Sequence, residues 1–209
     1  MPARLLICGF SAFPEAIRNP AQAAVEALAA QDWSPQAATT DFLTVPVAWN
    51  CAAEAILERL AARPADAVLV VGVAVSAASF QVERLGRNRA SLERPDDLGR
   101  LWPAAEILTG GPGEIRSLAP TRSMVTAIGR ADLPAELSDD AGDYLCNFTY
   151  YRLLVAQAPP TVGFLHVPQV REFVEGAGFG LEDVVRAVQA AAGALAEAVS
   201  HPDAAHHTA

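Results

Sequence analysis

The segment 66–74, "DAVLVVGVA", restricts the possible fold more than any other part of the sequence. After its first residue it is apolar at every position rather than at alternate ones, so both faces of an extended strand here would be apolar. Strands of this kind are found where a sheet is covered by other layers on both sides. The segment therefore predicts a central strand of a sheet that is buried on both faces.

Strand-like and helix-like patterns alternate along the rest of the chain. This alternation predicts an α/β fold, a three-layer α/β/α sandwich around a central, mostly parallel mixed sheet. The proline- and glycine-rich segment 92–120 interrupts the rhythm and predicts a long excursion with a hairpin near "TGGPGE". We expect strands at residues 4–10, 40–47, 66–74, 79–87, 134–138 and 161–167, and helices at 20–31, 50–62, 121–130, 142–157 and 180–200.

Length and charge limit the kinds of protein that the sequence can encode. The 209 residues suit a single domain, which we place at 1–200, followed by a tail at 201–209 that we expect to be disordered. The formal net charge of −9 argues against a nucleic acid or an anionic membrane as partner. The first residues lack the pattern of a signal peptide, and the uncharged run 67–82 is too short and too polar for a membrane span. We therefore expect a soluble, cytoplasmic protein.

The three cysteines form neither a disulfide framework nor a metal site. No CxxC motif or cluster of histidine and cysteine suggests zinc, so we expect free thiols and no bound metal. Cys8 and Cys51 lie in strand-like and helix-like patterns and are interpreted as packing residues. Cys146, in "AGDYLCNFTYYRLL", lies near the start of a predicted helix and is either a buried packing residue or a nucleophile.

His166 is the only histidine of the predicted domain, since the other three lie in the tail. It follows the strand pattern "TVGFL", so it should stand at the carboxyl end of a strand, where α/β sheets bind ligands. The start of a helix favours a thiolate at Cys146 and offers free N–H groups to an oxyanion. His166 is then a candidate base and Glu83, in "FQVERLGRN", a candidate for orienting its ring. The alternatives are a structural histidine and a Glu83 paired with Arg84 or Arg87.

The arginines of residues 84–100 are interleaved with acidic residues. A mixture of this kind indicates an exposed, salt-bridged surface rather than a binding patch.

Four separate blocks resemble the pyroglutamyl peptidases, also called pyrrolidone-carboxylate peptidases. The blocks are "GFSAFPEAIRNP", "VGVAVSAASFQVERLGRN", "AGDYLCN" and "GFLHVP", which occur in the family's order and extend over nearly the whole chain. The resemblance implies a cysteine peptidase that removes N-terminal pyroglutamate from small peptides through a thioester. By motif match, Cys146 is the nucleophile, His166 its general base and Glu83 the group that orients the imidazole.

The same resemblance implies a substrate site. Phe10, Phe13 and Tyr144 match the aromatic positions that hold the pyrrolidone ring, and Val73 matches a position that contacts the lactam through its backbone. For the two phenylalanines, ordinary core packing is the alternative. The resemblance further implies a cytosolic enzyme without a cofactor, and a homo-oligomer, either a dimer or a tetramer.

One departure from the family pattern concerns the reaction itself. The arginine of the family's GxAxGR motif falls on Ala77, in "GVAVSAASF". That arginine would help to stabilise an oxyanion, and the loss of one such donor can cost roughly 10²–10³ in rate. The alternatives are therefore a related amidase with altered specificity, or a weakly active or inactive homologue that still binds a lactam.

Overall fold

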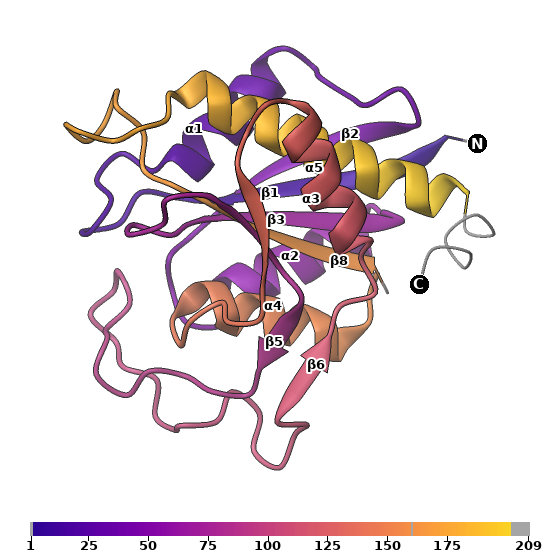
Figure 1. Ribbon diagram of the computed structural model, residues 1–209. Helices are drawn as coiled ribbons and strands as arrows, with labels where there is room; N and C mark the ends of the chain where they lie inside the picture. The colour runs from indigo at the N-terminus through magenta and orange to yellow at the C-terminus, as the bar shows by residue number, and fades with distance from the viewer. Residues whose placement is uncertain (1, 160, 202–209) are drawn as a thin grey trace.

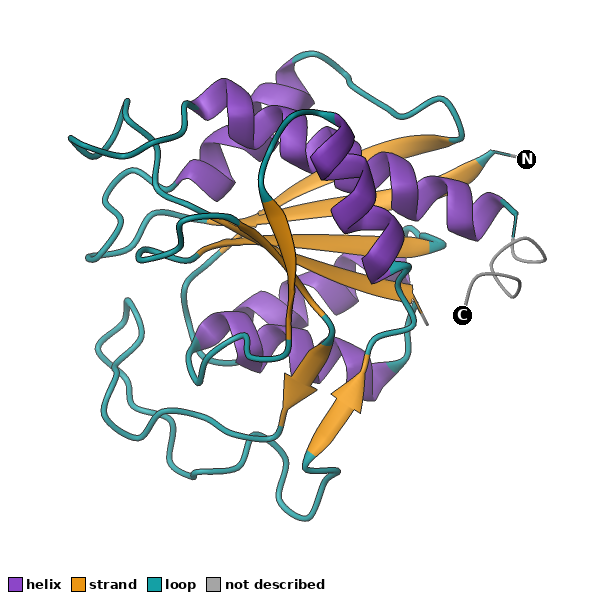
Figure 2. Ribbon diagram, viewed as in Figure 1, coloured by secondary structure: helices purple, strands orange, loops and turns teal. Residues whose placement is uncertain are grey.

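A six-stranded sheet between two layers of helices forms the body of the protein (Figures 1 and 2). The computed structural model describes residues 2–159 and 161–201. Strand β4 is antiparallel to β8, and all other neighbours in this sheet are parallel. The predicted three-layer fold with a mostly parallel mixed sheet is confirmed. The strands, in their order across the sheet, are β2 (Ala38–Val45), β1 (Ala3–Phe10), β3 (Ala67–Val73), β8 (Thr161–Val167), β4 (Phe80–Glu83) and β7 (Ala135–Ser138).

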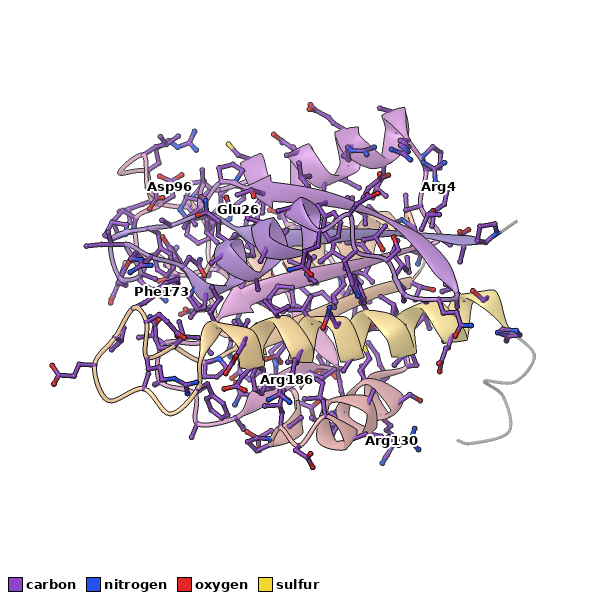
Figure 3. The ribbon with its side chains drawn as sticks, turned by 90° about the horizontal axis from the view of Figure 1, so that it is seen from above. Arg4, Glu26, Asp96, Arg130, Phe173 and Arg186 are labelled. Atoms are coloured by element: carbon purple, nitrogen blue, oxygen red, sulfur yellow. The ribbon has the colours of Figure 1, made fainter. Side chains whose placement is uncertain are left out.

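The helices divide between the two faces of the sheet. Figure 1 shows α1 (Pro20–Ala30), α3 (Thr121–Arg130) and α5 (Leu181–Ser200) on one face, and α2 (Cys51–Ala62) and α4 (Leu145–Ala156) on the other. Seen from above, α5, which carries Arg186, runs along its face of the sheet (Figure 3). Within the described residues, no helix is long and apolar enough to span a membrane.

Alternate residues of the central strands supply two separate cores. In β3, Leu69 and Val71 pack in the core beneath α1 and α5, whereas Val68 and Val70 pack in the core beneath α2 and α4. Cys8 belongs to the second core, is fully buried, and has its pKa raised by that burial, as suits a packing residue. The unbroken apolar run of β3 is thus explained by a strand covered on both faces.

Helix α4 begins three residues later than its sequence pattern predicts. Gly142 has a φ of +83°, a left-handed conformation that a helix cannot continue, and the first helical residue is Leu145. The last residue before the helix is Tyr144, in extended conformation. Cys146 is therefore the second residue of the helix, at its exposed N–H end.

The prediction of one strand over 79–87 is wrong, because the chain changes sheets after Glu83. Strand β5 (Leu85–Arg87) pairs in antiparallel fashion with strand β6 (Glu114–Arg116) in a separate two-stranded sheet. A β-carbon on Gly86 would lie 2.9 Å from the Cα of Tyr151, so β5 passes directly against α4. The predicted hairpin at "TGGPGE" is also wrong, since β6 pairs with β5 across the segment 88–113. The predicted tail lies outside the described residues from 202 onwards.

Two glycine-to-alanine substitutions should change stability in opposite directions. A β-carbon on Gly9 would lie 2.8 Å from the backbone oxygen of Ala21, so Gly9→Ala should lower the free energy of unfolding by about 1–3 kcal/mol. A β-carbon on Gly193, inside α5, would meet nothing within 4 Å, so Gly193→Ala should raise it by about 0.5–1 kcal/mol. Urea denaturation measures both. A Gly9→Ala protein as stable as the wild type would contradict the packing described for β1 and α1.

Candidate active site

A cavity of about 370 Å³ lies at the carboxyl edge of the sheet, beside the start of α4. Strands β1, β3 and β8 end at this edge. The two strands that follow β1 in the chain, β2 and β3, lie on opposite sides of it, so the strand order reverses at β1. In α/β sheets, ligands bind outside the carboxyl ends of the strands at such a point. Glu83 lies outside the cavity and contacts His166. The other six residues singled out in the sequence all line the cavity: Phe10, Phe13, Val73, Tyr144, Cys146 and His166.

Glu83 and His166 form a buried pair between neighbouring strands. The Nδ1 atom of His166 on β8 lies 2.8 Å from Oε1 of Glu83 on β4, and both side chains are buried. Arg84 instead pairs with the carboxylate of Asp139, and Arg87 donates from Nε to the carbonyl oxygen of Asp139. The alternative pairing of Glu83 with either arginine is therefore absent from the described residues.

The surroundings of His166 favour its protonated form. Burial by itself lowers the pKa of the ring. The charge of Cys146 and a hydrogen bond with it, together with the hydrogen bond and charge of Glu83, outweigh that penalty and raise the pKa to about 10. At neutral pH the ring is thus an imidazolium, with Nδ1 bound to Glu83 and the other nitrogen left for Cys146.

Gly72 makes room for the thiol. A β-carbon at this position would lie 2.8 Å from Sγ of Cys146 and 3.1 Å from the ring of Phe164. Gly72 is also the partner of His166 in the ladder between β3 and β8, so the thiol and the imidazole sit over adjacent strands. The sequence patterns did not single out Gly72. A lone glycine inside a strand of branched apolar residues was nevertheless a signal of close approach.

The N-terminus of α4 offers donors beside the thiol. Tyr144, the capping residue, makes no side-chain hydrogen bond to the first turn. The amide groups of that turn, including that of Cys146, are therefore available to a negatively charged oxygen. Ala77, the position at which the sequence resemblance implies an arginine in related chains, closes a turn through its N–H to the oxygen of Ala74 and is not among the cavity-lining residues.

Tyr144 is held firmly at the wall of the cavity. Its hydroxyl donates to the carbonyl oxygen of Pro95 at 2.7 Å, and the guanidinium of Arg94 lies 4.0 Å from the centre of its ring. The ring of Trp49 packs against it edge-on, with centroids 5.4 Å apart. Burial and the nearby charge of Glu15 raise the pKa of Tyr144 to about 12, so its hydroxyl remains a donor. Arg94 also lines the cavity, and it is exposed and paired with Glu15, as expected of an exposed, salt-bridged surface.

The arrangement suits acyl transfer through a sulfur nucleophile. Within residues 2–159 and 161–201, no group of three or more histidine, cysteine, aspartate or glutamate side chains could hold a metal ion. Cys146 and His166 line the cavity, and the buried carboxylate of Glu83 contacts the imidazole from behind, an arrangement compatible with a nucleophile, a base and an orienting group.

Comparisons with known proteins identify related chains over almost the full length. A family model described as pyroglutamyl peptidase matches residues 3–198. The pyrrolidone-carboxylate peptidase of Streptococcus suis (strain 05ZYH33) is 32% identical over 202 residues, covering 93% of each chain. The crystal structure of pyroglutamyl peptidase I from Bacillus amyloliquefaciens has a TM-score of 0.86 and 25% identity, and the match covers 94% of this chain and 96% of that one. The pyrrolidone carboxyl peptidase of Thermococcus litoralis has a TM-score of 0.87 at 22% identity, with 96% of each chain covered, and shares the fold.

The protonation of His166 should depend on Cys146. Because contact with Cys146 helps to raise the pKa of the ring, Cys146→Ala should lower that pKa, as measured by NMR titration of the imidazole protons. In the wild type the folded-state pKa lies above the ordinary value of about 6.5. The stabilisation from the protonated ring is therefore complete below that pH and is lost as the pH rises through about 10. The imidazole signal that is missing from the spectrum of His166→Gln is the signal of His166. An unchanged titration in the alanine variant would contradict the described contact.

Proposed function

Because the chain belongs to the pyroglutamyl peptidase family, we propose that it hydrolyses the bond between an N-terminal pyroglutamyl residue and the rest of a peptide. The observation that carries the proposal is the buried Glu83–His166 pair beside Cys146, at a cavity lined with aromatic side chains. A neutral lactam has an apolar body with one donor and one acceptor, and a cavity of this composition suits it.

The reaction begins with the thiolate of Cys146. It attacks the carbonyl carbon that joins the pyroglutamyl residue to the next residue, and the carbonyl oxygen becomes an oxyanion. The amide groups at the start of α4 can donate to that oxygen, in addition to the favourable end of the helix dipole. They are the oxyanion donors that remain in a chain with alanine at position 77.

His166 then transfers the proton in both halves of the reaction. The imidazolium gives its proton to the departing amine as the carbon–nitrogen bond breaks, which leaves a thioester on Cys146. The neutral ring next takes a proton from the water that attacks the thioester. Pyroglutamate leaves, and the thiolate and imidazolium are restored. Throughout, Glu83 holds Nδ1 and stabilises the charged ring.

The lactam ring is assigned to the aromatic residues that line the cavity. Phe13 and Tyr144 are half-buried there, and Phe10 lines the cavity as a buried residue. Strand β3 continues to Val73, whereas its pairing with β1 ends at Val71. On the side of β1, the backbone groups of Val73 can therefore bind the lactam. The hydroxyl of Tyr144 is already engaged and contributes position rather than a bond to the ligand.

The remaining expectations concern the location and the oligomeric state of the protein. A cytoplasmic location and assembly into a dimer or tetramer remain predictions, and light scattering on the purified protein measures the second. Of the alternatives, an amidase of different specificity and an inactive lactam-binding homologue predict no release of pyroglutamate, and a weakly active homologue predicts slow release.

Replacement of Cys146 should abolish turnover without unfolding the protein. Cys146→Ala removes the nucleophile and should lower kcat for a fluorogenic pyroglutamyl amide by about 10⁴-fold or more. Cys51→Ala is the matched control, because Cys51 is a half-buried thiol at the first position of another helix and lies outside the cavity. Circular dichroism checks the fold of both. Wild-type protein that cleaves no pyroglutamyl amide at high concentration would exclude the proposed function.

The two phenylalanines should separate substrate binding from stability. Phe13 is half-buried at the cavity, so Phe13→Ala should raise KM several-fold with little loss of stability. Phe10 is 3% exposed and belongs to a core, so Phe10→Ala should lower the free energy of unfolding by about 3–5 kcal/mol. Steady-state kinetics and urea denaturation give both quantities. An unchanged KM in the Phe13 variant would remove that ring from the substrate site.

A further inference from the structure

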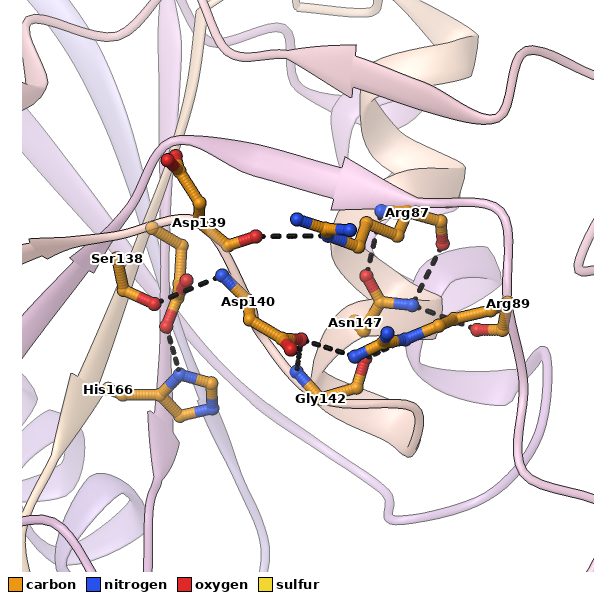
Figure 4. Close-up of polar contacts among 9 residues, drawn as sticks. Arg87, Arg89, Ser138, Asp139, Asp140, Gly142, Asn147 and His166 are labelled. Carbon is orange, nitrogen blue, oxygen red and sulfur yellow. Dashed lines mark hydrogen bonds and ion pairs between the residues drawn. The ribbon is translucent and has the colours of Figure 1, made fainter.

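The chain segment that follows Glu83 is joined along its length, by hydrogen bonds and ion pairs, to the loop that leads to Cys146. We call residues 84–91 the clamp segment and residues 138–144 the nucleophile loop. Figure 4 shows part of this contact, with Arg87 and Arg89 reaching Asp139, Asp140 and Gly142. The bonds run from Arg84 N to Ser138 O (2.8 Å), from the Arg84 guanidinium to the Asp139 carboxylate, from Arg87 Nε to Asp139 O (3.0 Å), from Arg89 Nε to Gly142 O (3.2 Å), from the Arg89 guanidinium to the Asp140 carboxylate, and from Ser91 N to Asp143 O (2.7 Å).

Asn147 extends this contact into the helix itself. Its side chain is fully buried and makes three hydrogen bonds, all to the backbone of the clamp segment. Oδ1 accepts from the N–H of Arg87 at 2.9 Å, and Nδ2 donates to the carbonyl oxygens of Arg87 at 2.8 Å and Arg89 at 2.9 Å (Figure 4). A buried amide satisfied in this way fixes its own backbone strongly, because any displacement leaves polar groups unpaired.

The side chain of Asn147 is placed where it can affect the geometry of the reacting groups. Asn147 directly follows Cys146 in the first turn of α4, and the segment it holds directly follows Glu83. The carboxylate that orients His166 and the turn that carries the thiol are therefore joined by one set of bonds. The thiol also has little free space, since Sγ lies only 2.8 Å from the place where a β-carbon of Gly72 would be. A shift of about 1 Å in reacting atoms can cost about 100-fold in rate.

We propose that Asn147 is a positioning residue that holds the Cys146 thiolate in register with the Glu83–His166 pair by anchoring the first turn of α4 to the backbone of Arg87 and Arg89. Its effect on turnover rests on the proposed function. Its effect on the reactivity of the thiol does not, because alkylation of Cys146 requires only the contact with His166.

Asn88 offers a matched control within the same stretch of chain. Its side chain also makes hydrogen bonds to backbone, two of them half-buried and two exposed, but to residues 107, 108 and 111 of the excursion rather than to α4. Asn88→Ala thus removes a comparable amide clamp and leaves the bonds of Asn147 in place.

The test compares Asn147→Ala with Asn88→Ala, with Asn147→Ser measured as well in case the alanine variant does not fold. For the Asn147 variants we expect kcat to fall about 100-fold with KM changed less than about twofold. Alkylation of Cys146 by iodoacetamide at pH 6.5, measured by peptide mapping, should slow about tenfold, while that of Cys51 stays unchanged. Asn88→Ala should lower Tm and leave kcat and Cys146 alkylation at wild-type values.

Two results would overturn the proposal. One is wild-type kcat and wild-type Cys146 alkylation in a folded Asn147 variant. The other is an equal loss of both in Asn88→Ala, which would make the effect a general loosening of the excursion. If the wild-type protein releases no pyroglutamate, the proposed function fails, and the alkylation rates alone then decide the role of Asn147.

Discussion

The buried pair of Glu83 and His166 is the interaction on which the rest of the site depends. A carboxylate that is completely removed from water is costly unless a partner compensates it, and within the described part of the chain Oε2 of Glu83 has no hydrogen-bond partner. The nearby charge of an imidazolium supplies that compensation through Oε1. The carboxylate in turn favours the protonated ring, and the ring contacts Cys146. The charge of the ring is therefore acceptable because of the carboxylate, and the charge of the carboxylate because of the ring.

The topology explains how residues distant in sequence form this unit. His166 stands near the carboxyl end of β8, and β4 enters the sheet beside it in the antiparallel direction, which brings Glu83 alongside. On the other side of β8, the absence of a side chain at Gly72 in β3 leaves space for a group from another layer. Helix α4 fills that space with Cys146 at its N-terminal turn, where helix amides face the cavity. Strand β4, strand β8 and the start of helix α4 thus supply one residue each.

Much of this could be predicted from the sequence, because its strongest signals are local. The unbroken apolar run of β3 indicated a strand covered on both faces, and the alternation of patterns indicated the three-layer fold. The single histidine of the domain and the position of Cys146 near a helix start indicated which residues to combine. The change of sheets after Glu83 could not be predicted, because residues 80–87 have an uninterrupted strand pattern, while the pairing of β5 with β6 and its contact with α4 involve distant residues. The roles of Asn147 and Arg94 were equally hidden, since both follow from contacts with segments about 50 or 60 residues away.

The central claim is that Cys146, activated by His166, is acylated by the substrate. Rapid acid quenching of the enzyme during turnover of a pyroglutamyl ester, followed by mass spectrometry and peptide mapping, tests it most directly. The account predicts a pyroglutamyl adduct on the peptide that contains Cys146, present in the wild type and absent from Cys146→Ala. Turnover with the adduct on Cys51 or another residue, or with no adduct at any quench time under conditions where deacylation limits the rate, would contradict it.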